Sequence, residues 1–177
     1  MVARPLFTAS DLLTVRRAAV LAEKLTGDFF ELAGDEWRRN PYRLFTQKET
    51  EDALYQENVF AHVVRCTPLH ATGQGSDKGT SFGIVLQDPD ILRALLRSYV
   101  HDLWTLVLFI LTHELIHIVR FRRSEADFEA SSEARDEEER LVHHMTRDIL
   151  SGVRNTDCVL KLYHAGTAPT EPETNSN

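Results

Sequence analysis

Five residues in the second half of the chain carry its clearest sign of chemistry, because residues 113–117 read His-Glu-Leu-Ile-His. On a helix, residues four apart share a face, so His113 and His117 can hold one metal ion between them. Zinc is the expected ion, since it accepts imidazole nitrogen and tetrahedral geometry. Zinc lowers the pKa of a bound water to near neutrality, and Glu114 stands one step round the helix to take its proton. The motif therefore predicts a zinc-dependent hydrolase with Glu114 as general base.

The motif is unusual for a chain of this composition, which contains 8 histidines in 177 residues. Random placement of the same residues gives roughly 0.03 such matches, the kind of risk that any short motif carries. The apolar run at residues 103–111 comes directly before it, so the helix is expected to be buried. The competing interpretation is that His113 and His117 are core histidines bonded to backbone or carboxylates. Buried polar groups need such partners, because an unpaired one costs about 1–3 kcal/mol.

A catalytic zinc usually takes a third protein ligand, and a second helix downstream offers several acids. The apolar residues of this segment cluster around one direction at about 100° per residue, and Glu138 falls near the centre of their stripe. A carboxylate on a stripe that faces the core needs a reason, and a metal supplies one. Glu138 is therefore the predicted third ligand, and Glu137 and Glu139 are the near alternatives. The apolar residues that define the stripe are Leu141, Val142, Met145 and Ile149.

An H-E-x-x-H helix followed about twenty residues later by a Glu on a second helix resembles the gluzincin class of zinc metallopeptidases. The short chain is also similar to minimal single-domain gluzincins and to metallopeptidase domains that cleave bacterial repressors. The resemblance spans residues 113–150. It implies that zinc is bound by His113, His117 and Glu138, and that Glu114 is the general base.

Two departures from related patterns are visible in the sequence. An Asp commonly stands four residues after the third ligand in gluzincins, and Val142 occupies that position here. The Gly and third His of the metzincin extension are missing between Ile118 and Ala130. The hydrogen-bond partners that would orient the metal ligands are therefore unassigned from the sequence.

Four further residues are candidates for supporting roles. His143 or His144 could donate a hydrogen bond to the oxyanion, or one of them could replace Glu138 as a ligand. The alternative is that His144 is solvated and His143 borders the core. Tyr163 and His164, near the C-terminus, are further candidate oxyanion donors.

Length and composition limit the class of protein that the chain can belong to. The length of 177 residues predicts one domain, residues 1–164, and the Thr-, Pro- and Asn-rich residues 165–177 are expected to form a disordered tail. The net charge of −7 argues against nucleic-acid binding, and no run reaches the roughly eighteen apolar residues of a membrane span. Two cysteines and no signal-peptide pattern predict a cytoplasmic protein. The resemblance to zinc metallopeptidases implies a protein or peptide as its substrate. The oligomeric state stays open.

The elements predicted around the motif define an α+β, predominantly helical fold, with a small sheet beside the H-E-x-x-H helix and a second ligand helix. Helices are expected from residue 11, capped by Ser10, and over residues 90–122, with a break near 98–102. Strands are expected at residues 59–66 and 81–87, and residues 37–45 and 72–80 are expected to be loops. Asp88 is expected to cap the helix that follows the second strand. An exposed edge of the strand at residues 82–86 is a candidate for binding the substrate backbone, with a plain buried strand as the alternative.

Two other classes of function compete with the hydrolase. Glu114-x-x-His117 matches the spacing of a di-iron helix bundle, but such a site needs a second Glu-x-x-His. Glu139 and His143 are four residues apart rather than three. The other alternative is a non-catalytic binding module in which a metal stabilises the fold, and the missing Asp motivates it.

Overall fold

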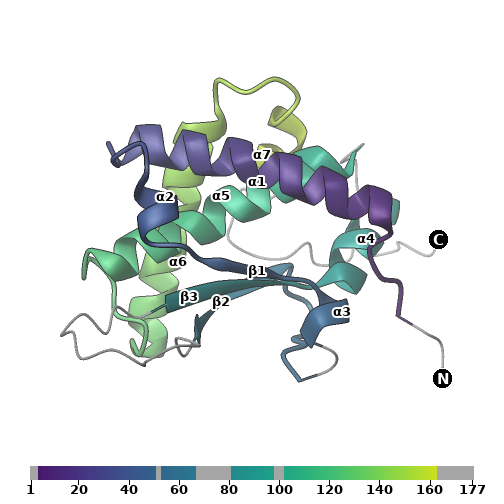
Figure 1. Cartoon of the computed structure of the whole chain (residues 1–177), viewed down its shortest axis with the longest axis horizontal. Coiled ribbons are helices and arrows are strands. Elements are labelled where there is room, and N and C mark those ends of the chain that lie inside the picture. Colours follow the sequence, from purple (N-terminus) through teal and green to yellow (C-terminus); the bar gives the residue numbers. More distant parts are fainter. Residues whose placement is uncertain (1–3, 51–52, 67–80, 98–101, 163–177) are drawn as a thin grey trace, which may run out of the picture.

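The computed structural model describes residues 4–50, 53–66, 81–97 and 102–162. The predicted fold class is confirmed, because this part of the chain is predominantly helical with one small sheet (Figure 1). Residues 72–80, Tyr163, His164 and the tail at 165–177 lie outside the described residues. The helices are α1 (Ala9–Phe29), α2 (Glu36–Arg39), α3 (Gln47–Thr50), α4 (Asp88–Arg97), α5 (Leu103–Arg122), α6 (Ser132–Leu150) and α7 (Asp157–Leu162). The strands are β1 (Arg43–Phe45), β2 (Ala61–Cys66) and β3 (Ser81–Leu86).

The sheet has three strands in the order β1-β3-β2. β1 runs parallel to β3, with Leu44 opposite Ile84, and β2 runs antiparallel, with Val63 opposite the same residue. The candidate edge strand at residues 82–86 is thus the central strand, and neighbours occupy both of its sides. Among the described residues the two edge strands are β1 and β2, so an added peptide strand would have to pair with one of these.

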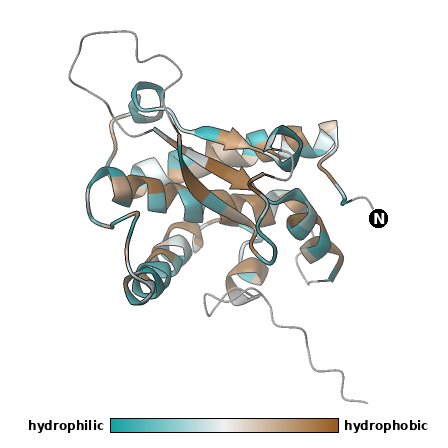
Figure 2. Ribbon diagram, turned by 90° about the horizontal axis from the view of Figure 1, so that it is seen from below, coloured by the Kyte–Doolittle hydropathy of each residue, from teal (hydrophilic) through white to brown (hydrophobic). Residues whose placement is uncertain are grey.

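The core is built around α5, which lies between α1 and the sheet (Figure 1). Every residue from 105 to 120 is buried, so the helix is enclosed on all sides. Small residues let α1 approach α5 closely, and β3 contributes large apolar side chains from the other side. Figure 2 shows the strands to be largely hydrophobic. The buried residues of α1 are Val15, Ala18, Ala19, Ala22 and Thr26.

The apolar character of α5 is explained by this burial. By length and composition the helix could cross a membrane, but 89% of its most apolar window is buried inside the fold. Core helices of this kind are hydrophobic on every face. The helix begins at an N-cap, Asp102, whose carboxylate accepts hydrogen bonds from the backbone N–H and the hydroxyl of Thr105 at 2.8 and 2.9 Å.

Several local predictions need correction. The cap of α1 is Thr8 rather than Ser10, because Thr8 and Asp11 form a reciprocal capping box. Residues 37–45 are not one loop, since they contain most of α2 and all of β1. Asp88 does not cap its own helix: its carboxylate accepts hydrogen bonds from the backbone N–H groups of Phe7 and Gln47, both at 3.1 Å, which ties two distant segments to α4.

The remaining element predictions agree with the structure. Strands β2 and β3 lie where they were expected, and the long helical region divides between α4 and α5. The helix that was predicted to carry the third metal ligand is α6. It begins after Ser131, whose hydroxyl accepts a hydrogen bond from the backbone N–H of Ala134. Neither cysteine forms a disulfide, so Cys66 and Cys158 are free thiols.

Candidate metal centre

Three side chains from two helices converge on one point. His113 and His117 project from α5, and Glu139 reaches them from α6. The two Nε2 atoms lie 3.2 Å apart, and each lies 3.2 Å from an oxygen of the Glu139 carboxylate. The helical spacing explains the first pair, because residues four apart stack one turn above another. The turn of the chain through residues 123–131 then brings α6 into contact with α5.

This geometry fits a zinc ion. Ligand atoms about 2.0–2.1 Å from a tetrahedral zinc lie roughly 3.3 Å from one another. The two Nε2 atoms, 3.2 Å apart, lie at about this separation, and each is 3.2 Å from its own oxygen of the Glu139 carboxylate. One donor atom of each residue lies within 4.8 Å of the other two, so the three side chains can reach one ion. Two imidazole nitrogens and one carboxylate oxygen are also a ligand set that catalytic zinc uses, and the set leaves the fourth position open. The residues that could hold a metal are thus His113, His117 and Glu139.

The third residue of the cluster is Glu139, not the predicted Glu138. Glu138 is held by Arg120, whose Nε and Nη2 donate hydrogen bonds to its two oxygens at 2.7 and 2.9 Å. Arg120 also pairs with a second carboxylate, because its Nη1 donates a hydrogen bond to a Glu125 oxygen at 2.9 Å. Glu138 was expected to face the core because it falls near the centre of the apolar stripe, and its side chain is indeed only 14% exposed. The group that compensates its buried charge is the Arg120 guanidinium and not the expected metal.

The direction of the apolar stripe on α6 also differs from the expectation. Its buried residues are Val142, Thr146 and Leu150, whereas Leu141 is 38% exposed. Thr146 was counted as polar, but it is fully buried because its hydroxyl donates a hydrogen bond to the carbonyl oxygen of Val142 at 2.7 Å. Glu139 lies one turn before Val142, at the margin of this stripe, with its side chain 52% exposed. Glu137, the other alternative ligand, lies on the cavity wall outside the cluster.

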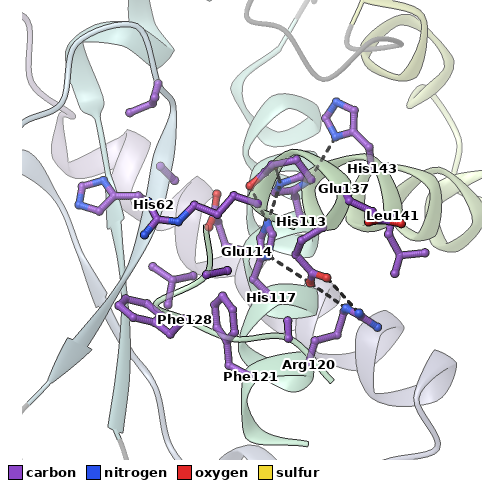
Figure 3. Close-up of a pocket in the computed structure, with 18 of the residues that line it drawn as sticks. His62, His113, Glu114, His117, Arg120, Phe121, Phe128, Glu137, Leu141 and His143 are labelled. Carbon is purple, nitrogen blue, oxygen red and sulfur yellow. Dashed lines mark hydrogen bonds and ion pairs between the residues drawn. The ribbon is translucent and has the colours of Figure 1, made fainter. Parts of the chain in front are cut away.

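Glu114 is buried beside the cluster and opens onto the cavity. Burial raises its pKa to about 7, and the nearby Glu139 carboxylate adds to this effect, while His117 opposes it. A carboxylate whose pKa lies near neutrality is suited to take and return a proton. Figure 3 shows Glu114 projecting from α5 toward the strand that carries His62.

Burial and the neighbouring carboxylates set the protonation of the cluster. Burial lowers the pKa of His113 to about 4, so this imidazole is neutral at physiological pH and has a lone pair to offer. Burial alone would lower the pKa of His117, but the carboxylates of Glu139, Glu114 and Glu138 outweigh it and raise the value. Burial likewise opposes the ionisation of Glu139, yet its hydrogen bonds to the two imidazoles hold its pKa below the usual range. The carboxylate is therefore ionised, as a metal ligand must be.

The Nδ1 atoms on the far sides of the two imidazoles face different groups, and only His113 has one within hydrogen-bond distance. His113 Nδ1 lies 3.3 Å from His143 Nδ1, and His117 Nδ1 lies 3.7 Å from a Glu138 oxygen. His144, in contrast, is 73% exposed and pairs only loosely with Asp148, at 3.6 Å. Of the two adjacent histidines, the structure brings His143 to the cluster and leaves His144 at the surface. The signal in the sequence is the spacing of four between Glu139 and His143, which places both on one face of α6.

The cluster forms part of the wall of a cavity of about 870 Å³. Residues 58–63, in and before the edge strand β2, form one side, and α5, α6 and residues 125–130 form the rest (Figure 3). Apolar rings lie at the side of the cavity, among them Phe121 and Phe128, whose centroids are 5.3 Å apart. The cavity combines apolar walls with a few convergent polar groups, which is typical of ligand sites. Sequence reasoning missed the contribution of β2 to this wall.

Comparisons with protein-family models, with curated proteins and with solved structures found no match to this chain. The interpretation of the site therefore rests on its residues and their geometry.

Proposed function

We propose that the protein is a zinc-dependent hydrolase, a metallo-endopeptidase of the gluzincin kind. The single observation that carries the proposal is the convergence of two imidazole Nε2 atoms, 3.2 Å apart, on the Glu139 carboxylate beside a buried Glu114. Unrelated core histidines would be satisfied by backbone or single partners, whereas here both Nε2 atoms face one carboxylate. The ligand set, the open fourth position and the adjacent acid are the components that zinc hydrolysis needs.

The charges around the cluster support a divalent cation. Arg120 neutralises Glu138 through two hydrogen bonds, so this pair adds no net charge. Glu139 and Glu114 remain, and together they supply two negative charges when both are ionised. Without a cation, these two buried or half-buried carboxylates would repel each other, which adds to the burial that chiefly raises the pKa of Glu114. A divalent ion balances them, and a bound zinc would also keep Glu114 ionised at neutral pH.

The proposed roles follow from where each group lies. A zinc ion at the cluster would supply Lewis acidity, polarising a carbonyl oxygen and acidifying a bound water. Glu114 removes the proton of the attacking water and returns it to the leaving amine. Its burial keeps bulk water away from the carboxylate and maintains a pKa that suits both steps. Without this residue the nucleophile would have no positioned base.

The shape of the cavity favours an extended protein or peptide substrate. Edge strand β2 forms one wall, and an extended chain can add to an exposed strand edge through backbone hydrogen bonds. Such pairing recognises backbone rather than a particular side chain. The volume of about 870 Å³ is enough for several residues, and its apolar walls favour apolar side chains.

The direct test is Glu114→Gln, which keeps the size of the side chain and removes the base. We expect hydrolysis of a quenched fluorogenic peptide library to fall by about 10²- to 10⁴-fold, while zinc content by mass spectrometry stays at one per chain. Glu133→Gln is the matched control, because Glu133 is an exposed glutamate of α6 that does not line the cavity, and it should leave turnover within about twofold.

Two outcomes would overturn the proposal. Full activity of Glu114→Gln, on a peptide that the unmodified chain cleaves, would remove the general base from the account. If the unmodified chain binds zinc but cleaves nothing, and a chelator unfolds it rather than leaving it folded, the non-catalytic metal-stabilised module replaces the hydrolase.

A further inference from the structure

The face of His113 that points away from Glu139 meets a second imidazole. His113 Nδ1 and His143 Nδ1 lie 3.3 Å apart, and the two rings are nearly perpendicular, at 84° with centroids 5.1 Å apart. We propose that His143 is a positioning residue, which accepts a hydrogen bond from His113 Nδ1–H and so aims His113 Nε2 at the metal. This inference rests on the proposed metal site.

The hydrogen-bond direction follows from the chemistry of the ligand. An imidazole that binds metal through Nε2 carries its proton on Nδ1, and that N–H requires an acceptor. The nearest ring nitrogen on that side is His143 Nδ1, so this atom must offer its lone pair. The proton of neutral His143 is then on Nε2. One tautomer of each ring satisfies the contact, and two Nδ1–H groups facing each other would repel.

Packing holds both rings in this arrangement. Phe109, one turn before His113 on α5, stacks on the His113 ring at 29° with centroids 6.4 Å apart. The same phenyl ring meets His143 edge-on, at 70° and 5.9 Å. His143 is also fixed by the helix that supplies the third ligand, because it lies one turn after Glu139. A shift of α6 would therefore move the ligand and the positioning residue together.

The two ligand imidazoles are supported by different chemistry. His117 Nδ1 faces the carboxylate of Glu138 at 3.7 Å, and Arg120 holds that carboxylate in place. His113 faces a neutral ring instead. A carboxylate partner raises the basicity of a ligand imidazole more than a neutral acceptor does. A carboxylate at position 143 should consequently strengthen metal binding, provided that acceptance of this hydrogen bond is the role of His143.

The test compares zinc affinity in three variants by competition with a chromogenic chelator. His143→Leu keeps an apolar side chain against Phe109 but has no acceptor, and it should weaken zinc binding about 10- to 100-fold. His143→Asp restores an acceptor and should bind zinc at least as tightly as the unmodified chain. His144→Leu, at the exposed neighbouring position, should bind zinc within about twofold of it. Unchanged affinity in His143→Leu, or equal weakening in His143→Leu and His143→Asp, would overturn the proposal.

A second measurement needs no substitution, so it stands even where a variant fails to fold. Two-bond ¹H–¹⁵N correlation spectra of the zinc-loaded chain report which nitrogen of each ring carries the proton. We expect His113 protonated on Nδ1 and His143 protonated on Nε2. A proton on His143 Nδ1 would overturn the proposal. Neither readout involves hydrolysis, so failure here leaves the Glu114 test unaffected, whereas a chain that takes up no zinc would overturn the site itself.

Discussion

Helices α5 and α6 together supply the side chains of the proposed metal site, but they are held in the fold in different ways. All residues from 105 to 120 of α5 are buried, and both ligand imidazoles lie inside that stretch. In α6 only Val142, Thr146 and Leu150 are buried, and its ligand Glu139 is half-exposed. Packing therefore fixes the imidazoles, whereas the position of Glu139 depends on a narrow contact and on the charges around it. The α5 half of the site is therefore held rigidly by the core, and the α6 half should become better ordered when the ion binds.

The largest expected effect tests the difference in packing. Leu108→Ala removes a fully buried side chain of α5 and should lower the free energy of unfolding by roughly 2–5 kcal/mol. Leu141→Ala, on α6, removes a side chain that is 38% exposed and should cost less than about 1 kcal/mol. Urea unfolding monitored by circular dichroism measures both. Equal losses at the two positions would contradict the contrast between the helices.

The next pair separates the roles of two adjacent acids on α6. Loss of a residue that hydrogen-bonds to a metal ligand weakens metal binding roughly 10- to 100-fold. Glu139→Ala removes a proposed ligand itself, so it should weaken zinc binding by more than that. Glu138→Ala leaves the Arg120 guanidinium without its closest partner in a buried position and should cost roughly 3 kcal/mol of stability.

Titration calorimetry with zinc and urea unfolding in chelator give the two readouts for both variants. The discriminating result is the order of the two losses. If Glu138→Ala loses more zinc affinity than Glu139→Ala, then the third ligand is Glu138 after all, as the sequence pattern first indicated.

Metal addition tests whether the α6 half of the site responds to the ion. Zinc at a hundred times its dissociation constant should stabilise the folded chain by about 2.7 kcal/mol, since it binds the folded state alone. Hydrogen exchange should slow most in α6 around Glu139, where few side chains are buried, and least in the enclosed part of α5. Uniform slowing along both helices would mean that α6 is already as firmly held as α5.

The smallest expected effect concerns the two helix caps. Asp102→Ala removes an acceptor 2.8 Å from the backbone N–H of Thr105 and should destabilise the fold by about 1 kcal/mol. Ser131→Ala removes a longer contact of 3.4 Å to the backbone N–H of Ala134, so about 0.5 kcal/mol is expected. Thermal unfolding in chelator compares them, and a larger loss at Ser131 would reverse the predicted order.

The α5 half of the site was predictable from sequence because its information is local. His113, Glu114 and His117 lie within five consecutive residues, and a helix fixes their relative positions without any knowledge of the rest of the chain. The apolar run before them indicated a buried helix, and the structure confirms it. The longer helices α1, α4, α5 and α6 and both longer strands were also predicted, since each has a periodic pattern or a clear terminal residue.

The α6 half was harder to predict because a partly exposed helix has a weak pattern. Counting apolar residues excluded Thr146, which is buried, and included Leu141, which is exposed, so the stripe pointed to Glu138 and not to Glu139, which lies beside the two imidazoles. The counterion of Glu138 could not be seen either. Arg120 stands three residues after His117, but only the packing of α6 against α5 shows that it reaches Glu138.

The order of strands in the sheet shows the same limit for non-local contacts. The strand at residues 82–86 was a candidate edge, yet it is central. A signal was available, because Phe82 and Val85 belong to a continuous apolar run, as in strands that are covered on both faces. β2, with His62 and Arg65, has the mixed pattern of an edge strand. Pairing itself depends on segments far apart in the chain, which no local pattern encodes.

The central claim is that one zinc ion binds between α5 and α6, and a crystal structure of the zinc-loaded chain with anomalous data at the zinc edge tests it most directly. The account predicts one anomalous peak per chain, about 2.0–2.1 Å from His113 Nε2, His117 Nε2 and a Glu139 oxygen, with the open position facing Glu114. An anomalous map without a peak at these three side chains, from crystals grown in excess zinc, would contradict it.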